Sequence, residues 1–496
     1  AHEAGVIDTY PIEPFERAVQ LANEHALLTQ QVNARLNLAT AFLDRGNIER
    51  ANHWLASARA LTHQPSTELS HWATEIEARI ASLEGDHEHA LSRYDYLSVT
   101  GQALSLPATT WRAETRRASV LAQTGRIDDA ILAHARAESA LDDTLIRVPL
   151  ADGRETLVAA HRHAMREHLT LLLQSDRRAD ALALIAREQR RSLKLIHVAA
   201  QFDALAPAQR AAWDILQSEY RAARSTLARS LSEGWMLAAD EFEQLERSAQ
   251  REQARLLGLL DRGAALLNDS RGSEADESAD TPDAPTLAAW RGRDAWHVLF
   301  REHGQVAHVT THCDMERAVD RAQCVLAAAS PMLGEPAAID LLVDHDLASV
   351  DWHALRIKDR HLIDLGTVRY RSGLAPAREV QPTPGLAVLV ADPTGNLRAA
   401  RKEALGVQKA LKARGGWTPQ MLTGAGAGAQ QVIASVEQAA LFHYAGHAVF
   451  GDGVGWGSEL SLAQDTRMTV GDVLTLRNAP AVVVLSGCET ALNQGD

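Results

Sequence analysis

The chain has 496 residues, of which 46% are hydrophobic and 23% are charged, a composition typical of a soluble protein with two to four domains. Its formal net charge of −14 argues against direct nucleic-acid binding, which needs a basic face. No apolar run approaches the roughly 18 to 20 residues that span a bilayer, so we expect no membrane contact.

The first part of the chain is helical in pattern and contains a repeat. Gly46, Gly85 and Gly125 recur about 39 and 40 residues apart, and an alanine follows each glycine five residues later. A weaker fourth copy has Asp176 and Ala181 in the matching places. Glycine at this position ends one helix in a left-handed conformation, and the small alanine lets the next helix pack closely. The alternative is a helical bundle without repeats.

One such helical hairpin is too small to bury its own apolar face, so copies must stack. The unit is similar to the tetratricopeptide repeat (TPR), with longer helices. Because repeat arrays of this kind bind peptides or helices, we expect protein partners to bind these repeats. A partner bound there would recruit a substrate or regulate the rest of the chain.

The pattern changes twice along the middle of the chain. After the repeats, amphipathic spacing predicts a long helical hairpin, and the stretch "NDSRGSEADESADTPDAP" then reads as a flexible acidic linker. Short β-prone runs alternate with helices after that linker. The predicted parts are TPR-like repeats, a helical connector, the linker and an α/β domain, at residues 1–190, 191–268, 269–285 and 286–496.

The α/β domain is predicted to hold a mainly parallel sheet covered on both faces. Two of its strands end in reactive side chains: "ALFHYAGHAVFGDG" ends in a loop containing His447, and "AVVVLSGC" ends at Cys488. We expect "AVVVL" to be a buried central strand and "MTVGDVLTL" to be the crossover helix, with a capping box formed by Thr469 and Asp472. Neighbouring parallel strands lie roughly 4.8 Å apart, so His447 and Cys488 can meet at one sheet edge.

Cysteine beside histidine is a minimal arrangement for acyl transfer. Imidazole activates the thiol and later protonates the leaving amine, and backbone amides stabilise the oxyanion. Around the two reactive residues, the small residues Gly446, Ala448 and Gly487 allow a peptide to approach the backbone. The alternatives are a buried structural Cys488 and a structural loop His447.

These residues also carry a family resemblance. "FHYAGHAVF" followed by "VVVLSGCETAL" resembles the CHAT domain, a caspase-like cysteine peptidase of the clan that includes caspases and separase. Further upstream, "LLVDHDLASVDWHAL", "ADPTGNLRAARKEA" and "MLTGAGAGAQQV" are similar to other segments of that family, so the resemblance runs from about Leu287 to Asp496. It implies that Cys488 is the nucleophile and His447 the catalytic histidine.

The resemblance also implies a regulated endopeptidase that cleaves a specific protein, of a kind that acts in bacterial, including antiviral, defence or in cell death. The family's usual glycine is Ala448 here and its usual alanine is Gly487. If position 448 needs a positive φ, the alanine costs about 1 kcal/mol. The family continues beyond the cysteine motif, so we expect part of the domain to be missing after Asp496, through proteolytic processing or otherwise. An inactive scaffold is the alternative function.

Other polar residues of this domain are second candidates. His443 lies within the strand before His447, where packing or hydrogen bonding behind the site is expected. Asp344 and Asp392 follow strands and either line the substrate site or cap turns, and Glu489 follows the nucleophile and either supports the site or caps a helix.

The remaining two cysteines, Cys313 and Cys324, are expected in the core or in a helix. An odd and sparse set of three cysteines does not predict a disulfide framework, and it favours a cytoplasmic location. No His/Cys cluster has metal spacing, so neither a metal nor another cofactor is expected.

Overall fold

The chain folds into two compact units, which are Ala1–Ser175 with Ala206–Ser270 and Asp176–Leu205 with Arg271–Asp496. The computed structural model describes residues 11–61, 66–147, 154–191, 285–334, 338–348, 350–371, 383–449, 458–469 and 479–487, together with scattered positions between 207 and 262 and residues 473 and 476. The predicted acidic linker and most of the predicted helical connector lie outside these residues. Within them, no helix is long and apolar enough to cross a membrane.

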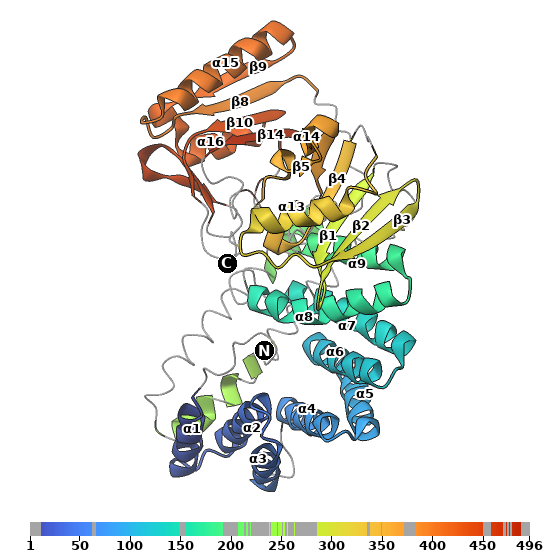
Figure 1. Cartoon of the computed structure of the whole chain (residues 1–496). Helices are drawn as coiled ribbons and strands as arrows, with labels where there is room; N and C mark the ends of the chain where they lie inside the picture. The colour runs from blue at the N-terminus through green and yellow to red at the C-terminus, as the bar shows by residue number, and fades with distance from the viewer. Residues whose placement is uncertain are drawn as a thin grey trace. The chain divides into compact units, whose positions relative to one another are not determined.

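The first unit is built from helical hairpins, as the repeat predicts (Figure 1). The helices described between residues 11 and 175 are α1 (Glu13–Glu24), α2 (Leu28–Asp44), α3 (Ile48–Leu61), α4 (Thr67–Leu83), α5 (His87–Ala103), α6 (Pro107–Gln123), α7 (Ile127–Arg147) and α8 (Arg154–Gln174). The three repeat glycines have φ values of +72°, +83° and +76° between the paired helices. The alanines five residues later, Ala51, Ala90 and Ala130, are each 0% exposed, so the close approach inferred from their size is confirmed.

The fourth repeat copy is divided between the two units. Asp176 adopts φ +57°, so it takes the left-handed conformation of the glycines in the other copies. The helix after it, α9 (Arg178–Arg191), is part of the second unit and contacts strands β1 (Thr286–Arg291), β3 (Gln305–Thr311) and β4 (Ala338–Val343). Along the sequence, the first unit therefore gives way to the second between Ser175 and Asp176. This boundary precedes residue 190, where composition suggests that the repeats end.

The first sheet of the second unit is mixed rather than parallel. It contains β1, β3, β4 and also β2 (Trp296–Glu302) and β7 (Thr367–Tyr370), in the order β3-β2-β1-β4-β7. Strands β1, β2 and β3 pair antiparallel, whereas β4 pairs parallel with both β1 and β7. Helix α13 (Ala318–Ala329) contacts β2 and β3, and its Val325 and Leu326 join the core with Trp296 and Phe300. Between β4 and β7 lie the short elements η4 (His345–Leu347), η5 (Trp352–Ala354), β5 (Arg356–Ile357), β6 (Arg360–His361) and α14 (Leu362–Leu365).

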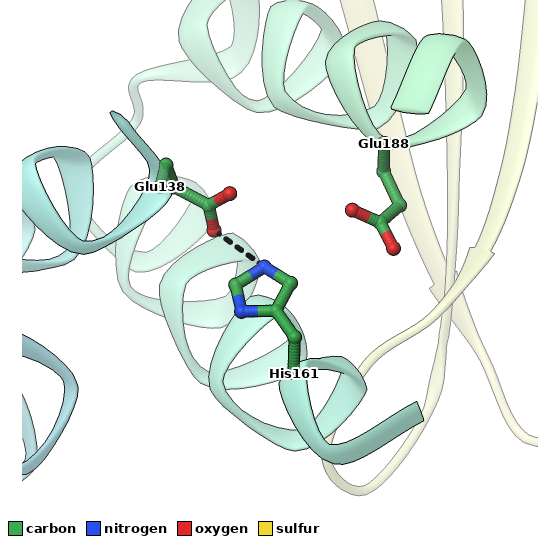
Figure 2. Close-up of side chains that lie close together, drawn as sticks. All are labelled: Glu138, His161 and Glu188. Carbon is green, nitrogen blue, oxygen red and sulfur yellow. Dashed lines mark ion pairs between the residues drawn. The ribbon is translucent and has the colours of Figure 1, made fainter. Parts of the chain in front are cut away.

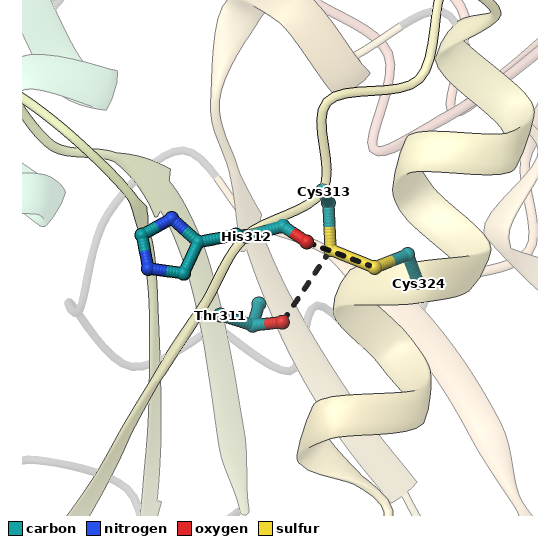
Figure 3. The surroundings of a disulfide bond; sticks show 4 residues. All are labelled: Thr311, His312, Cys313 and Cys324. Carbon is teal, nitrogen blue, oxygen red and sulfur yellow. Dashed lines mark hydrogen bonds between the residues drawn. A yellow bond between two sulfur atoms is a disulfide. The ribbon is translucent and has the colours of Figure 1, made fainter.

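A disulfide joins Cys313 and Cys324 across this packing (Figure 3). Cys313 follows β3 and is 1% exposed, and Cys324 lies in α13, with a Cα–Cα distance of 5.9 Å. The Thr311 hydroxyl lies 3.6 Å from the Cys313 sulfur. The cysteines occupy the core and helix positions expected of them, but they form a disulfide, which the odd and sparse set of cysteines did not predict. Only the packing of α13 on β3 brings two residues that are 11 apart in sequence to bonding distance.

The second sheet is parallel throughout. Its strands are β8 (Leu386–Ala391), β9 (Thr418–Leu422), β10 (Leu441–Ala445) and β14 (Val482–Ser486), in the order β14-β10-β8-β9. Alternate residues of each strand face opposite sides. Val388, Val390, Phe442 and Tyr444 share a core with Val432 and Val436 of α16 (Ala429–Val436). Helix α15 (Arg398–Arg414) contacts β8, β9 and β10, and its Glu403 faces His443 of β10.

One expectation about this sheet needs correction. Strand β14 is an edge strand among the described residues, and Val483, Val484 and Leu485 are 51%, 42% and 42% exposed, so it is not a buried central strand. Thr469 is the last residue of β13 (Arg467–Thr469), which forms a small antiparallel sheet with β11 (Ala448–Val449) and β12 (Glu459–Ser461). The short turn η6 (Gly424–Ala427) precedes this sheet along the chain, and η7 (Ala463–Asp465) lies between β12 and β13. The capping box expected of Thr469 and Asp472 stays a prediction, because Asp472 lies outside the described residues.

Candidate active site

The register of β10 and β14 brings the two reactive motifs to the same edge of the parallel sheet. The strands are adjacent and parallel, and Ala445 pairs with Ser486. His447 lies two residues beyond Ala445, and Cys488 lies two residues beyond Ser486. The adjacency and direction predicted for these strands are therefore confirmed. Cys488 and Glu489 themselves lie outside the described residues, so their side chains are not placed.

The turn that carries His447 is held by backbone contacts on both sides. The Gly446 amide donates to the Ser486 carbonyl at 3.1 Å, and the Ser461 amide donates to the His447 carbonyl at 2.9 Å. The buried Tyr444 hydroxyl reaches the carbonyls of His447 and Ser461, and burial raises the pKa of Tyr444. The Gly446 amide, one of the backbone groups predicted to serve the oxyanion, is thus already engaged by Ser486.

Glycine at position 446 is required by the tyrosine next to it. A Cβ on Gly446 would lie 2.5 Å from the Tyr444 hydroxyl oxygen and 3.0 Å from Cδ of Pro393. Ala448, in contrast, lies in the extended conformation of β11 and is 8% exposed. Ala448 therefore carries none of the strain that a left-handed conformation would impose on an alanine.

His447 has a polar partner that the sequence did not suggest. Its Nε2 lies 2.9 Å from Oδ1 of Asn396, which follows strand β8. The Thr394 hydroxyl donates to the same Oδ1 at 2.7 Å. The only signal in the sequence is a polar loop after an apolar strand, in the segment "ADPTGNL". Which residue of that loop would reach His447 depends on the fold.

Asp392 anchors the loop that presents Asn396. Its own amide donates to the Ala445 carbonyl at 2.9 Å, and its Oδ1 accepts from the Leu397 amide at 2.8 Å. Its Oδ2 pairs with Arg401 at 2.8 Å, while Asp392 is only 1% exposed. Both carboxylate oxygens are therefore used within the loop and α15, which is the turn-capping arrangement and not a substrate-facing one.

Glu403 links the two strands on the α15 side of the sheet. Its Oε2 accepts from the Ser486 hydroxyl at 3.0 Å, and its Oε1 lies 3.2 Å from Nε2 of His443. The second contact is an ion-pair distance without hydrogen-bond alignment, since that nitrogen has no aligned partner. Burial lowers the pKa of His443, and the Glu403 charge opposes that effect. His443 therefore supports the strands from behind, as expected of it.

The remaining candidate, Asp344, belongs to the other sheet. It follows β4, and its carboxylate accepts from the amides of Asp346 and Arg291, each at 3.0 Å. These contacts cap the turn η4 and link β1 to β4. The structure therefore does not bring Asp344 together with His447 through a shared sheet edge.

A second group of titratable side chains is buried in the helical unit, between α7 and α8. His161 Nε2 pairs with Glu138 Oε1 at 3.0 Å, as Figure 2 shows, and His168 Nδ1 lies 3.9 Å from the same oxygen. The His134 ring stacks on that of His168 with centroids 5.1 Å apart. Burial lowers the pKa of His134 to about 3, with further lowering from His168. These contacts hold two helices of the repeat array together.

The second unit places the His447 turn at one edge of a parallel sheet, next to the strand that leads to the cysteine motif. The comparison with protein families assigns this part of the chain, because residues 322–496 match the CHAT domain. This part of the chain is therefore a CHAT domain, a member of a caspase-like peptidase family, preceded by TPR-like paired helices. The match begins within α13, so β1, β2 and β3 precede it in sequence.

Comparisons with individual proteins add little. No curated protein matches the chain. Among solved structures, the crystal structure of BtubC (BKLC) from P. vanneervenii is 12% identical, with a TM-score of 0.30. The match covers 56% of this chain and 97% of that one. A likeness of this size carries no argument about fold or function.

Proposed function

We propose that the chain is a regulated caspase-like cysteine endopeptidase, with Cys488 as nucleophile and His447 as general base and then general acid. The observation that carries the proposal is the parallel pairing of β10 and β14 with Ala445 opposite Ser486. Each reactive residue follows its strand by two positions, so both motifs start from equivalent points of one sheet edge. The CHAT match supports the same chemistry.

In this proposal the Cys488 thiol gives its proton to His447, and the sulfur attacks the carbonyl carbon of the scissile peptide bond. The C–N bond then breaks as His447 returns the proton to the leaving amine, and water releases the acyl group. Backbone amides of Cys488 and of the Ala448 segment stabilise the oxyanion. Ser486 is held through both its carbonyl and its hydroxyl, which supports a fixed approach to Cys488.

We further propose that the paired helices present a protein substrate or a regulatory protein to the peptidase. Stacked helical hairpins form extended surfaces suited to peptides and helices. The function would be cleavage of one specific protein, in defence or cell death, as members of the family perform. Neither nucleic acid nor membrane is part of the proposal.

A peptide library tests the peptidase activity without knowledge of the substrate. The purified chain is incubated with proteome-derived peptides, and new N-termini are identified by mass spectrometry. Cleavages should vanish in Cys488→Ala and in His447→Ala but persist in the control His345→Ala, at an exposed position of the same unit. If both active-site variants cleave like the unmodified chain, the proposal is wrong. Partner dependence is then tested by adding candidate binding proteins.

The alternative function is an inactive scaffold, which a strained alanine at position 448 would favour. Ala448 is extended and unstrained, so it gives the scaffold no support. Rates of labelling by a thiol-reactive peptidomimetic separate the two functions. An active enzyme labels Cys488 much faster than the other two cysteines under reducing conditions, whereas a scaffold labels all accessible thiols alike.

A further inference from the structure

We infer that Asn396 is a positioning residue for His447, and that it selects Nδ1 as the nitrogen that takes the thiol proton. The inference rests on the proposed function and adds to it a third residue and a tautomer. It starts from the 2.9 Å contact between Asn396 Oδ1 and His447 Nε2. The two residues are 51 apart in sequence, so only the sheet brings them together.

The contact determines where the imidazole carries its proton. An amide oxygen only accepts hydrogen bonds, so the ring nitrogen facing it must be Nε2–H. In the neutral ring the lone pair then lies on Nδ1. The Thr394 hydroxyl donates to the same Oδ1 at 2.7 Å, so this oxygen contacts both Thr394 and His447.

The loop holding Asn396 is anchored at its base. Asp392 bonds the Leu397 amide at 2.8 Å, and its other oxygen pairs with Arg401 of α15 at 2.8 Å. Its amide also bonds the Ala445 carbonyl at 2.9 Å, two residues before His447. The strands that carry Asn396 and His447 are therefore joined directly beside the contact, which keeps the two side chains in register.

The chemical consequence is a defined proton path. The Cys488 S–H proton moves to Nδ1, the electron pair stays on sulfur, and the ring becomes an imidazolium. Asn396 Oδ1 then accepts from a positively charged Nε2–H donor, and a charge-assisted bond is stronger than a neutral one. Asn396 thus favours the thiolate–imidazolium pair over the neutral pair without touching the substrate.

The pH dependence of Cys488 alkylation by iodoacetamide tests this. Thiolate displaces iodide, so the rate follows the thiolate fraction, and the alkylated peptide is quantified by mass spectrometry on the full-length chain. In the unmodified chain we expect Cys488 to be partly ionised at pH values well below the usual thiol pKa of about 8.5. His447→Ala should move the profile up to that value. Asn396→Ala should move it part of the way, and a shift of about one pKa unit lowers the alkylation rate about tenfold near neutral pH.

Asn396→Asp provides the readout that a merely structural role would not change. A carboxylate keeps the acceptor and adds a negative charge beside Nε2, so it stabilises the imidazolium and extends the thiolate–imidazolium range to higher pH. Thr394→Ala should weaken the contact in the direction of Asn396→Ala, with a smaller effect. Asn33→Ala, at an exposed position of α2, is the control for loss of an asparagine. Thermal unfolding of each variant checks that it remains folded.

The outcomes separate the two proposals. If His447→Ala leaves the profile unchanged, His447 does not activate the thiol, and both the proposed function and this inference are wrong. If His447→Ala shifts the profile while Asn396→Ala and Asn396→Asp both match the unmodified chain, only the role of Asn396 is wrong. Because Asn396 is exposed and Asp is isosteric, the second variant keeps the test decisive even if the alanine variant unfolds.

Discussion

At the scale of single residues, the site depends on close contacts that leave no room for change. Tyr444 is 0% exposed, and its hydroxyl donates to the carbonyls of His447 and Ser461. Gly446 lies so close to this hydroxyl that a Cβ there would clash with it, so the tyrosine requires the glycine. A motif that reads as permissive small residues is therefore a tightly packed turn.

Gly446→Ala should destabilise the second unit by about 2 kcal/mol and slow Cys488 labelling, because overpacking forces the backbone or Tyr444 to move. The added Cβ would lie 2.7 Å from Cζ of Tyr444. Gly385→Ala is the matched control, since its Cβ would meet Ala440 at an ordinary 3.6 Å. Urea unfolding and labelling rates measure both effects. Equal behaviour of the two variants would show that the turn can relax.

At the scale of elements, the packing of α13 on the first sheet is fastened covalently. The disulfide between Cys313 and Cys324 closes a short loop, with a sequence separation of 11. In the chain-entropy account, a loop of this size restricts the unfolded chain by about 3 kcal/mol. Disulfides persist in oxidising compartments and are rare in the reducing cytoplasm. The bond and the predicted cytoplasmic location are therefore in tension.

Reduction should therefore lower the free energy of unfolding of the second unit by about 3 kcal/mol. The measurement is urea unfolding of the Cys488→Ala chain with and without dithiothreitol, so that the candidate nucleophile does not interfere. In Cys324→Ser the reductant should have no effect. Two free thiols at these positions in the untreated protein, found by mass spectrometry, would contradict the bond.

The buried histidines of α7 and α8 predict a pH dependence of the helical unit. Burial lowers the pKa of His134 from 6.5 to about 3. The neighbouring histidines lower this pKa further, and Glu138 opposes them; the histidines are His168, His161 and His163. A second carboxylate, that of Glu167, lies 3.8 Å from Nε2 of His134. Below pH 6.5 the unfolded chain takes a proton that folded His134 refuses, so stability falls from pH 6.5 toward about 3.

His134→Gln should make this loss less steep by about 1 kcal/mol per pH unit, the value for one proton. Urea unfolding followed by far-ultraviolet circular dichroism gives the free energy at each pH. His53→Gln, at an exposed position of α3, controls for loss of an imidazole. An unchanged slope in His134→Gln would mean that His134 is protonated in the folded unit.

At the scale of the whole molecule, the boundary between the two compact units does not coincide with the end of the repeats in the sequence. Helix α9 completes the fourth repeat in sequence, yet it contacts β1, β3 and β4 of the second unit. Its Leu182 and Ile185 are 2% and 0% exposed. A division of the chain at the end of the repeats would therefore remove a helix that the second unit uses.

A chain that begins at Asp176 should remain soluble and monomeric, whereas one that begins at residue 192 should aggregate or bind a hydrophobic dye. The second truncation removes α9 and uncovers the apolar surface of the strands it contacts. Size-exclusion chromatography and dye fluorescence compare the two under identical conditions. Equal behaviour would show that α9 is dispensable for the second unit.

The sequence by itself determined the features that depend on local periodicity and spacing. Glycines that are each followed by an alanine five residues later predicted the hairpins. Glycine suits the positive φ at the end of a helix, and alanine lets two helices pack closely. Apolar runs separated by a crossover predicted that β10 and β14 are parallel neighbours, since chain connectivity restricts their direction. His447 was likewise identified by its place after an apolar strand.

Only the tertiary structure decided which distant residues touch. The partners Asn396 and Glu403, the Cys313–Cys324 bond and the edge position of β14 among the described strands all follow from how sheets and helices pack. No local pattern reports these contacts, because a polar residue in a loop or on a helix carries the same local signal whatever it faces. The physical reason is that periodicity encodes which face is buried, whereas side-chain contacts across the fold depend on the register between elements.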